Sequence, residues 1–194
     1  MAEATRSLEV LERSLAYTRM ALAGVRDSDL TRPTPCRRWD LNDLLAHMDD
    51  ALDAFTEGAH GTVDVSPVGF GLDHRVATLQ RKACALLGAW TASTPPDPVP
   101  PLVGGHRIDR ILLARAAALE IAAHGWDVGV ATGRGSDLPE ALARELLPSA
   151  WLLVGETDRT DAPNGTHRFA RVLPTDARAS YGEQFLAYVG RRRH

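Results

Sequence analysis

Glu120 and His124 are the residues whose types and spacing most directly suggest chemistry. They lie four positions apart in an apolar helical segment, so their side chains project from one face about a turn apart and can converge on one ion. On pattern alone, a hydrogen-bonded or solvated pair is the commoner outcome. The flanking Leu119, Ile121 and Ala122 count against that interpretation, because a buried carboxylate needs a partner. A metal ion would supply one.

His47 is the third residue of interest, at the border of an apolar stripe that includes Leu44 and Met48. A lone histidine in that position is more often a satisfied core residue than a ligand. If its helix faces the helix of Glu120 and His124, the three side chains form a two-histidine, one-carboxylate set, which is known for catalytic zinc and related divalent ions. Three protein ligands leave coordination positions open for water or substrate.

Hydrophobic periodicity predicts the helices that must carry these side chains. Asp40 is expected to cap the helix of His47, with Asp43 three residues on. Alternation long enough to build a sheet is missing, so the predicted fold class is all-α, an antiparallel four-helix bundle with an additional C-terminal helix and an irregular tail. The expected helices cover residues 4–25, 41–57, 73–90 and 108–131. A fifth helix is expected after a cap and a first-turn proline at Pro139, and it carries Leu142, Leu146, Leu147, Trp151 and Leu152. A short closing helix is expected at 181–189, and an extended piece at Phe169, Val172 and Leu173.

Length, composition, charge and cysteine count limit the classes of protein that this chain can belong to. The chain has 194 residues, 44% hydrophobic and 24% charged, with a net charge of −3, which fits one globular domain over residues 1–194 and predicts no nucleic-acid or membrane partner. Two cysteines are too few for a disulfide framework, and we expect no signal peptide or membrane span. These features predict a cytoplasmic protein. Only Lys82 among the 22 basic residues is lysine, and this bias, with the alanine richness, is typical of GC-rich bacterial coding. A homodimer is one possible assembly.

Several spaced motifs resemble the DinB-like metal-binding bundles and, within them, the mycothiol-dependent maleylpyruvate isomerase-like group. They are Thr34-Pro35-Cys36-x-x-Trp39-Asp40-Leu41, Leu45-x-His47-Met48, Glu120-x-x-x-His124-Gly125-Trp126-Asp127, Ala131-Thr132-Gly133-Arg134 and the closing segment from Tyr181 to Arg191. The resemblance covers most of the chain and concerns the group's N-terminal domain. The isomerase itself has a separate C-terminal domain, whereas about sixty residues follow Ala131 here.

The resemblance implies an up-down-down-up four-helix bundle in which His47, Glu120 and His124 bind zinc or nickel. It also implies that a low-molecular-weight thiol such as mycothiol is activated there for isomerisation or transfer to a small electrophile. That chemistry is physically sensible, because a divalent cation favours thiolate over thiol. No catalytic residue is assigned beyond these ligands.

Three further residues are weaker candidates for binding a cofactor or substrate. Asp127 could accept a hydrogen bond from His124 and so orient that ligand, or it could pair with a surface arginine. Cys36 could lie near the metal or be an inert buried thiol. Arg134 could hold an anion or complement the negative end of a helix. The motif tryptophans are core residues first, and three loop histidines are expected to be solvated: His60, His74 and His106.

Two other functions stay open at this stage. In a metal-dependent hydrolase, the open position would hold a water of lowered pKa, although the sequence names no base to assist it. In a metal-binding or sensing bundle without turnover, protein ligands alone would fill a closed site.

Overall fold

The computed structural model describes residues 2–36, 39–60, 72–92, 102–103, 106–135, 137–159 and 169–192. The described residues form six α-helices, two short 3₁₀ helices and one pair of two-residue strands, so the all-α prediction is confirmed. The elements are α1 (Ala2–Leu22), η1 (Asp27–Asp29), α2 (Leu41–His60), α3 (Leu72–Ala92), β1 (Leu102–Val103), β2 (His106–Arg107), α4 (Arg110–Thr132), α5 (Glu140–Leu153), η2 (Glu156–Asp158) and α6 (Tyr181–Tyr188).

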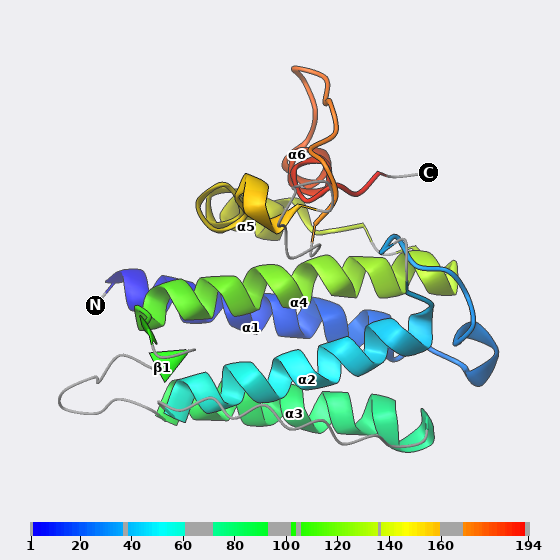
Figure 1. Cartoon of the computed structure of the whole chain (residues 1–194), viewed down its shortest axis with the longest axis horizontal. Helices are drawn as coiled ribbons and strands as arrows, with labels where there is room; N and C mark the ends of the chain where they lie inside the picture. Colours follow the sequence, from blue (N-terminus) through cyan, green and yellow to red (C-terminus); the bar gives the residue numbers. More distant parts are fainter. Residues whose placement is uncertain are drawn as a thin grey trace. The chain divides into compact units, whose positions relative to one another are not determined.

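The chain divides into two compact units, Met1–Ser136 and Asp137–His194. The N-terminal unit contains α1 to α4, which lie side by side in Figure 1. Within it, α1 packs most extensively against α4 and α2 against α3, and α2 also packs against α4. The expectation of a single domain over residues 1–194 stays a prediction.

Contacts between helix ends define how neighbouring helices run. Glu3 at the start of α1 pairs with Arg115 near the start of α4, and Arg110 donates to the carbonyl of Ala59 at the end of α2. The first pair joins the starts of α1 and α4, so these two helices run parallel. The second joins the start of α4 to the end of α2, so these two run antiparallel. Both agree with the expected up-down-down-up order, which itself stays a prediction.

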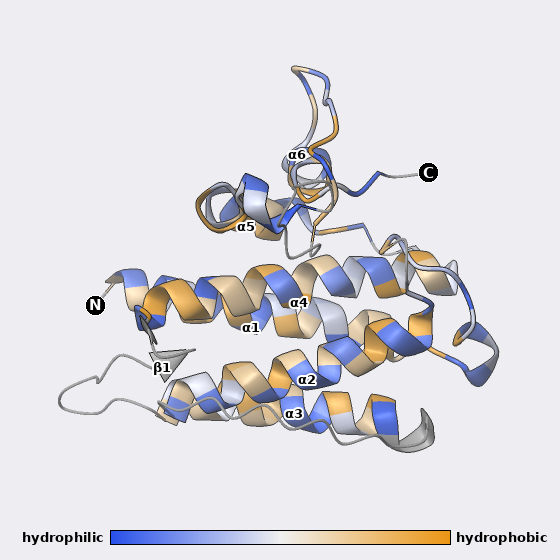
Figure 2. Ribbon diagram, viewed as in Figure 1, coloured by the Kyte–Doolittle hydropathy of each residue, from blue (hydrophilic) through white to orange (hydrophobic). Residues whose placement is uncertain are grey.

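The helices of the N-terminal unit have one buried face each, except α4. Figure 2 shows hydrophilic and hydrophobic residues alternating along α2 and α3, the pattern of half-buried helices. From Ala117 to Thr132, by contrast, all of α4 is buried except Glu120 and Val130, which are partly exposed. Most of α4 is therefore withdrawn from solvent on every side, as its alanine- and leucine-rich sequence predicts.

Asp40 caps α2 as predicted. Its carboxylate accepts from the backbone N–H of Asp43 at 3.0 Å, and the Asp43 carboxylate accepts from the N–H of Asp40 at 3.3 Å. These reciprocal bonds satisfy two of the unpaired donors at the helix start. The start of the helix that carries His47 is therefore fixed by local sequence.

The C-terminal unit is built on α5 and α6. Ser180 and Glu183 form a capping box at the start of α6, and Glu140 accepts from the N–H groups of Tyr181 and Gly182. The core of this unit includes Phe185, with four further buried side chains: Leu142, Leu146, Leu147 and Val189.

Several details of the sequence prediction need correction. Pro139 is the N-cap of α5 rather than a first-turn residue, and α1 ends at Leu22, three residues early. Trp151 and Leu152 are exposed, because the buried face of α5 runs through Leu142, Ala143, Leu146, Leu147 and Ala150 instead.

The expected extended piece near Phe169 is reduced to single contacts. Phe169 forms an isolated bridge with Arg159, and the N–H of Leu173 donates to the carbonyl of Ala187. The two-residue strands β1 and β2 were not predicted, because so short a pair leaves no alternation in the sequence.

Candidate metal centre

His47, Glu120 and His124 come together between α2 and α4. Nε2 of His47 lies 2.9 Å from Oε1 of Glu120, and Nε2 of His124 lies 3.2 Å from the same oxygen. The two imidazole ring centres are 5.0 Å apart, and one donor atom from each residue lies within 4.8 Å of the others. Three potential ligand atoms therefore share one small region, as a single ion would require.

The cluster is partly open. The side chains of His47 and Glu120 keep 32% and 18% of their exposure, whereas that of His124 keeps only 6%. One edge of the cluster therefore meets solvent while its other side lies in the bundle.

Charge in this cluster is shared between the carboxylate and the imidazoles. Burial raises the pKa of Glu120, but His124 and His47 outweigh burial and hold that pKa well below its usual value. Burial lowers the pKa of His124, yet Glu120, Asp127 and Cys36 together raise that pKa well above its usual value. These directions favour an ionised Glu120 beside a protonated His124, and a divalent cation would have to displace the histidine proton to bind between them.

Asp127 lies behind His124 and is fully buried. Its Oδ2 is 3.0 Å from Nδ1 of His124. Because an ionised carboxylate only accepts hydrogen bonds, Nδ1–H is the donor and Nε2 is directed to Glu120. Asp127 is thus buried against His124 rather than lying on the surface, and its role in orienting a metal ligand stays a prediction.

Cys36 reaches the same carboxylate. Its Sγ lies 3.4 Å from Oδ2 of Asp127, and Cys36, His124 and Asp127 form a second group of donor atoms within 4.8 Å. The loop before α2 brings Cys36 there, with Thr34 Oγ1 donating to the carbonyl of Trp39 at 2.9 Å. Cys36 is therefore near the candidate site, separated from the His47 side by the His124 ring.

Trp39 contacts both histidines. Its ring centre is 4.7 Å from that of His47 and 6.2 Å from that of His124. Trp39 was expected to be a core residue, but it is partly exposed and packs against the ring of His47. Trp126, the other motif tryptophan, is buried.

The remaining candidates lie elsewhere. Arg134 pairs with Asp29 at 3.6 Å, just after the end of α4, and its role in holding an anion stays a prediction. His60 is the last residue of α2 and is exposed, as expected. The side chains of His74 and His106 fall outside the described residues.

Two residues that position α4 were missed. Thr18 of α1 donates its hydroxyl to the carbonyl of Ile121 at 2.8 Å. A Cβ on Gly125 would lie 2.3 Å from that hydroxyl oxygen, so only glycine lets α1 approach here. A glycine inside a long apolar helix was the available signal, since it needs a packing reason.

Comparison with known proteins identifies the family. Residues 11–129 match the model of the mycothiol maleylpyruvate isomerase N-terminal domain, which spans more than half of the chain and all three clustered residues. The chain belongs to this family, and the predicted resemblance is confirmed.

Two relatives are uncharacterized proteins of Mycobacterium tuberculosis, from strains CDC 1551 and H37Rv. Each is 29% identical over 175 residues, covering 88% of this chain and 89% of the relative. No solved structure matches the chain significantly. Among the helices of the described residues, none is long and apolar enough to cross a membrane.

Proposed function

We propose that this chain binds one divalent metal ion, zinc or nickel, through His47, Glu120 and His124, and that it activates a low-molecular-weight thiol such as mycothiol there. The observation that carries the proposal is the convergence of two imidazole nitrogens on one carboxylate oxygen, at 2.9 and 3.2 Å. Two histidines and a carboxylate are a donor set that suits zinc, and imidazole also suits nickel. Membership of a mycothiol-related family supports the thiol.

When bound, such a cation would stabilise the thiolate, which is the nucleophilic form of the thiol. His124 is prepared for this role because Asp127 accepts its Nδ1–H and leaves Nε2 for the ion. Trp39 packs against the ring of His47 and limits its rotation. The partly exposed edge at His47 and Glu120 gives a polar thiol a path from solvent.

The reaction class that follows is transfer of the thiol to a small electrophile, or isomerisation through its reversible addition. In a transfer, the sulfur forms a bond to the electrophilic carbon, the leaving group departs with its bonding electron pair, and the thiol proton passes to solvent. The chain's own residues then have to hold the reactants together and shield the reacting carbon from water.

The test is a chromatographic assay of the zinc-loaded chain with mycothiol and 1-chloro-2,4-dinitrobenzene. We expect consumption of thiol that stops on chelation and falls sharply in Glu120→Gln, while Glu12→Gln, on the exposed face of α1, behaves as the wild type. Thiol consumption that is equal with and without chelator, and equal in both variants, would contradict the proposal.

A further inference from the structure

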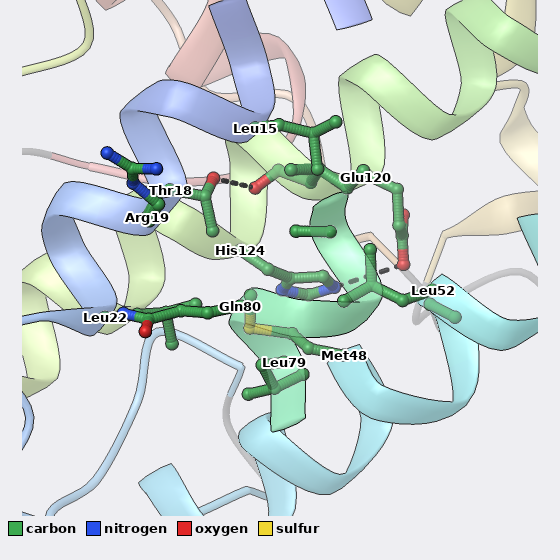
Figure 3. A pocket seen from close by; sticks show the side chains of 13 residues that line it. Leu15, Thr18, Arg19, Leu22, Met48, Leu52, Leu79, Gln80, Glu120 and His124 are labelled. Carbon is green, nitrogen blue, oxygen red and sulfur yellow. Dashed lines mark hydrogen bonds and ion pairs between the residues drawn. The ribbon is translucent and has the colours of Figure 1, made fainter. Parts of the chain in front are cut away.

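The void beside the candidate metal centre is too small for an organic molecule. It adjoins Glu120 and His124 and holds about 20 Å³, room for roughly one water molecule. Figure 3 shows the apolar side chains of Leu15, Met48 and Leu52 lining this void together with His124. A larger molecule therefore has to approach the cluster from its exposed edge or bind elsewhere in the chain.

A larger hollow lies in the C-terminal unit, where α6 meets the segment before it and the residues that follow it. It measures about 490 Å³ and opens to solvent. That size falls within the range of small-molecule binding sites. We call it the C-terminal hollow. Its wall combines apolar and charged side chains, among them Leu173, Pro174, Leu186, Arg178, Arg191 and Arg192.

Hydrogen bonds to α6 hold the walls of the C-terminal hollow in place. The N–H of Leu173 donates to the carbonyl of Ala187 at 2.9 Å, and the side-chain amide of Gln184 donates to the carbonyl of Ala179 at 2.7 Å. After the helix, the N–H of Arg191 donates to the carbonyl of Leu186 at 2.7 Å. The hollow is therefore preformed, so that a ligand would need to order little backbone on binding.

The charged groups of this wall favour an anion. Three arginines against two carboxylates give the wall a formal charge of +1. Both carboxylates already accept hydrogen bonds from nearby donors. Asp176 accepts from the N–H of Arg178 at 2.8 Å, and Glu183 accepts from the N–H and the hydroxyl of Ser180 at 2.8 and 2.9 Å.

The three arginines differ in what they can offer a ligand. Arg191 is buried and donates to the carbonyl of Val189 at 2.7 Å, so the fold fixes its charge in the wall. Arg178 and Arg192 are exposed, and within the described part of the chain their guanidinium groups make no hydrogen bond or ion pair. A guanidinium presents its N–H donors in a fork that matches a carboxylate. These two arginines are therefore available to an anion.

We propose that the C-terminal hollow binds a small organic carboxylate, an anion that carries a short alkyl or aryl group. Arg178 and Arg192 pair with the carboxylate, and the wall that includes Leu173, Pro174 and Leu186 contacts the apolar group. The proposal concerns the C-terminal unit alone and does not depend on metal binding.

The experiment is a calorimetric titration of the full, metal-free chain with 3-phenylpropionate. Two further probes each carry half of its chemistry: propionate has the charge with little apolar surface, and 3-phenylpropan-1-ol has the apolar group without the charge. We expect 3-phenylpropionate to bind roughly tenfold tighter than either, because the wall offers both charged and apolar contacts. Binding of the alcohol as tight as that of 3-phenylpropionate would contradict the role given to the arginines.

Substitution of a single arginine locates the site. Arg178→Gln should weaken binding of 3-phenylpropionate by roughly tenfold, because the carboxylate loses a charged donor. Arg192→Gln should have a similar effect. Arg144→Gln, exposed on α5 and outside the wall, is the matched control and should bind as the wild type.

Circular dichroism and zinc affinity check that each variant is folded, and both should be unchanged because these arginines are exposed. Equal binding of 3-phenylpropionate by Arg178→Gln and Arg144→Gln, or no binding by the wild type, would overturn the inference. Failure of the wild type to bind zinc would instead remove the proposed function, while carboxylate binding that depends on Arg178 would still support this site.

Discussion

Both compact units bury charged side chains, but they satisfy them differently. In the C-terminal unit, Arg159 donates to the carbonyls of Ala170 and Tyr188 at 2.8 and 3.0 Å, and its guanidinium lies 5.0 Å from the Tyr188 ring centre. Arg191 likewise donates to the carbonyl of Val189 and lies over the Phe169 ring. In the N-terminal unit, His124 meets other side chains, Glu120 and Asp127.

The difference distinguishes buried charged residues that support the fold from residues that can bind a ligand. An arginine that is paired with main-chain carbonyls is held by the fold itself, and its removal affects folding. When potential ligand atoms hydrogen-bond to one another, a metal ion can replace those hydrogen bonds by binding the same atoms. The comparison predicts that variants of the clustered residues in the N-terminal unit change metal affinity. Variants of the buried arginines in the C-terminal unit should change stability instead.

The largest expected effect comes from removing a ligand at the exposed edge. His47→Ala should lower zinc affinity on the order of 1,000-fold, since three ligands sharing about 12 kcal/mol of zinc binding contribute about 4 kcal/mol each. Competition with a chromophoric chelator measures it. His60→Ala, also on α2 but exposed at its end, is the control and should bind zinc normally. Equal affinities in the two variants would remove His47 from the site.

A smaller loss is expected when His124 loses its orienting partner. Asp127→Asn should weaken zinc binding roughly 10- to 100-fold, the usual effect of an outer-sphere carboxylate. The thermal midpoint of the metal-free protein is measured alongside, because reduced affinity with an unchanged midpoint identifies an orienting role. Asp50→Asn, exposed on α2, serves as the control. Full affinity in Asp127→Asn would show that the 3.0 Å contact does not matter for binding.

Arg159→Met tests the other half of the comparison. It should lower the free energy of unfolding by about 2 kcal/mol, because two carbonyls lose a charged donor, and leave zinc affinity unchanged. Denaturant titration measures the free energy of unfolding, and chelator competition measures the zinc affinity. The exposed Arg178→Met should change neither. If Arg159→Met altered zinc affinity, the proposed division between the units would fail.

The smallest effect is expected at the contact between α1 and α4. Thr18→Val keeps the shape of the side chain but removes the 2.8 Å bond to Ile121, at a cost of about 1 kcal/mol in unfolding free energy. Thr91 is exposed on α3 and its hydroxyl bonds only to carbonyls of its own helix, so Thr91→Val should cost less. Denaturant titration of both variants compares them, and a larger loss in Thr91→Val would contradict the role given to Thr18.

Local features of the chain were predictable because they depend on neighbours in sequence. The Asp40 cap and the shared face of Glu120 and His124 follow from spacings of three and four residues. Helical periodicity likewise located α1 to α6 to within a few residues.

Contacts between distant segments were not predictable in the same way. The approach of His47 to Glu120 depends on how α2 and α4 rotate against each other, so the spacing of these residues predicts it only if the two helices face each other, and otherwise it follows from the family resemblance. Cys36 meets Asp127 across 91 positions, and no spacing rule covers that distance.

Cobalt substitution tests the central claim most directly, because it distinguishes the two groups of donor atoms around His124. If His47, Glu120 and His124 hold the ion, the metal-freed chain should take up one Co²⁺, show visible d–d bands and give no thiolate-to-cobalt charge-transfer band in the near ultraviolet. Cys36→Ser should then leave the spectrum unchanged. Failure to bind Co²⁺, or a strong thiolate band that disappears in Cys36→Ser, would contradict the account.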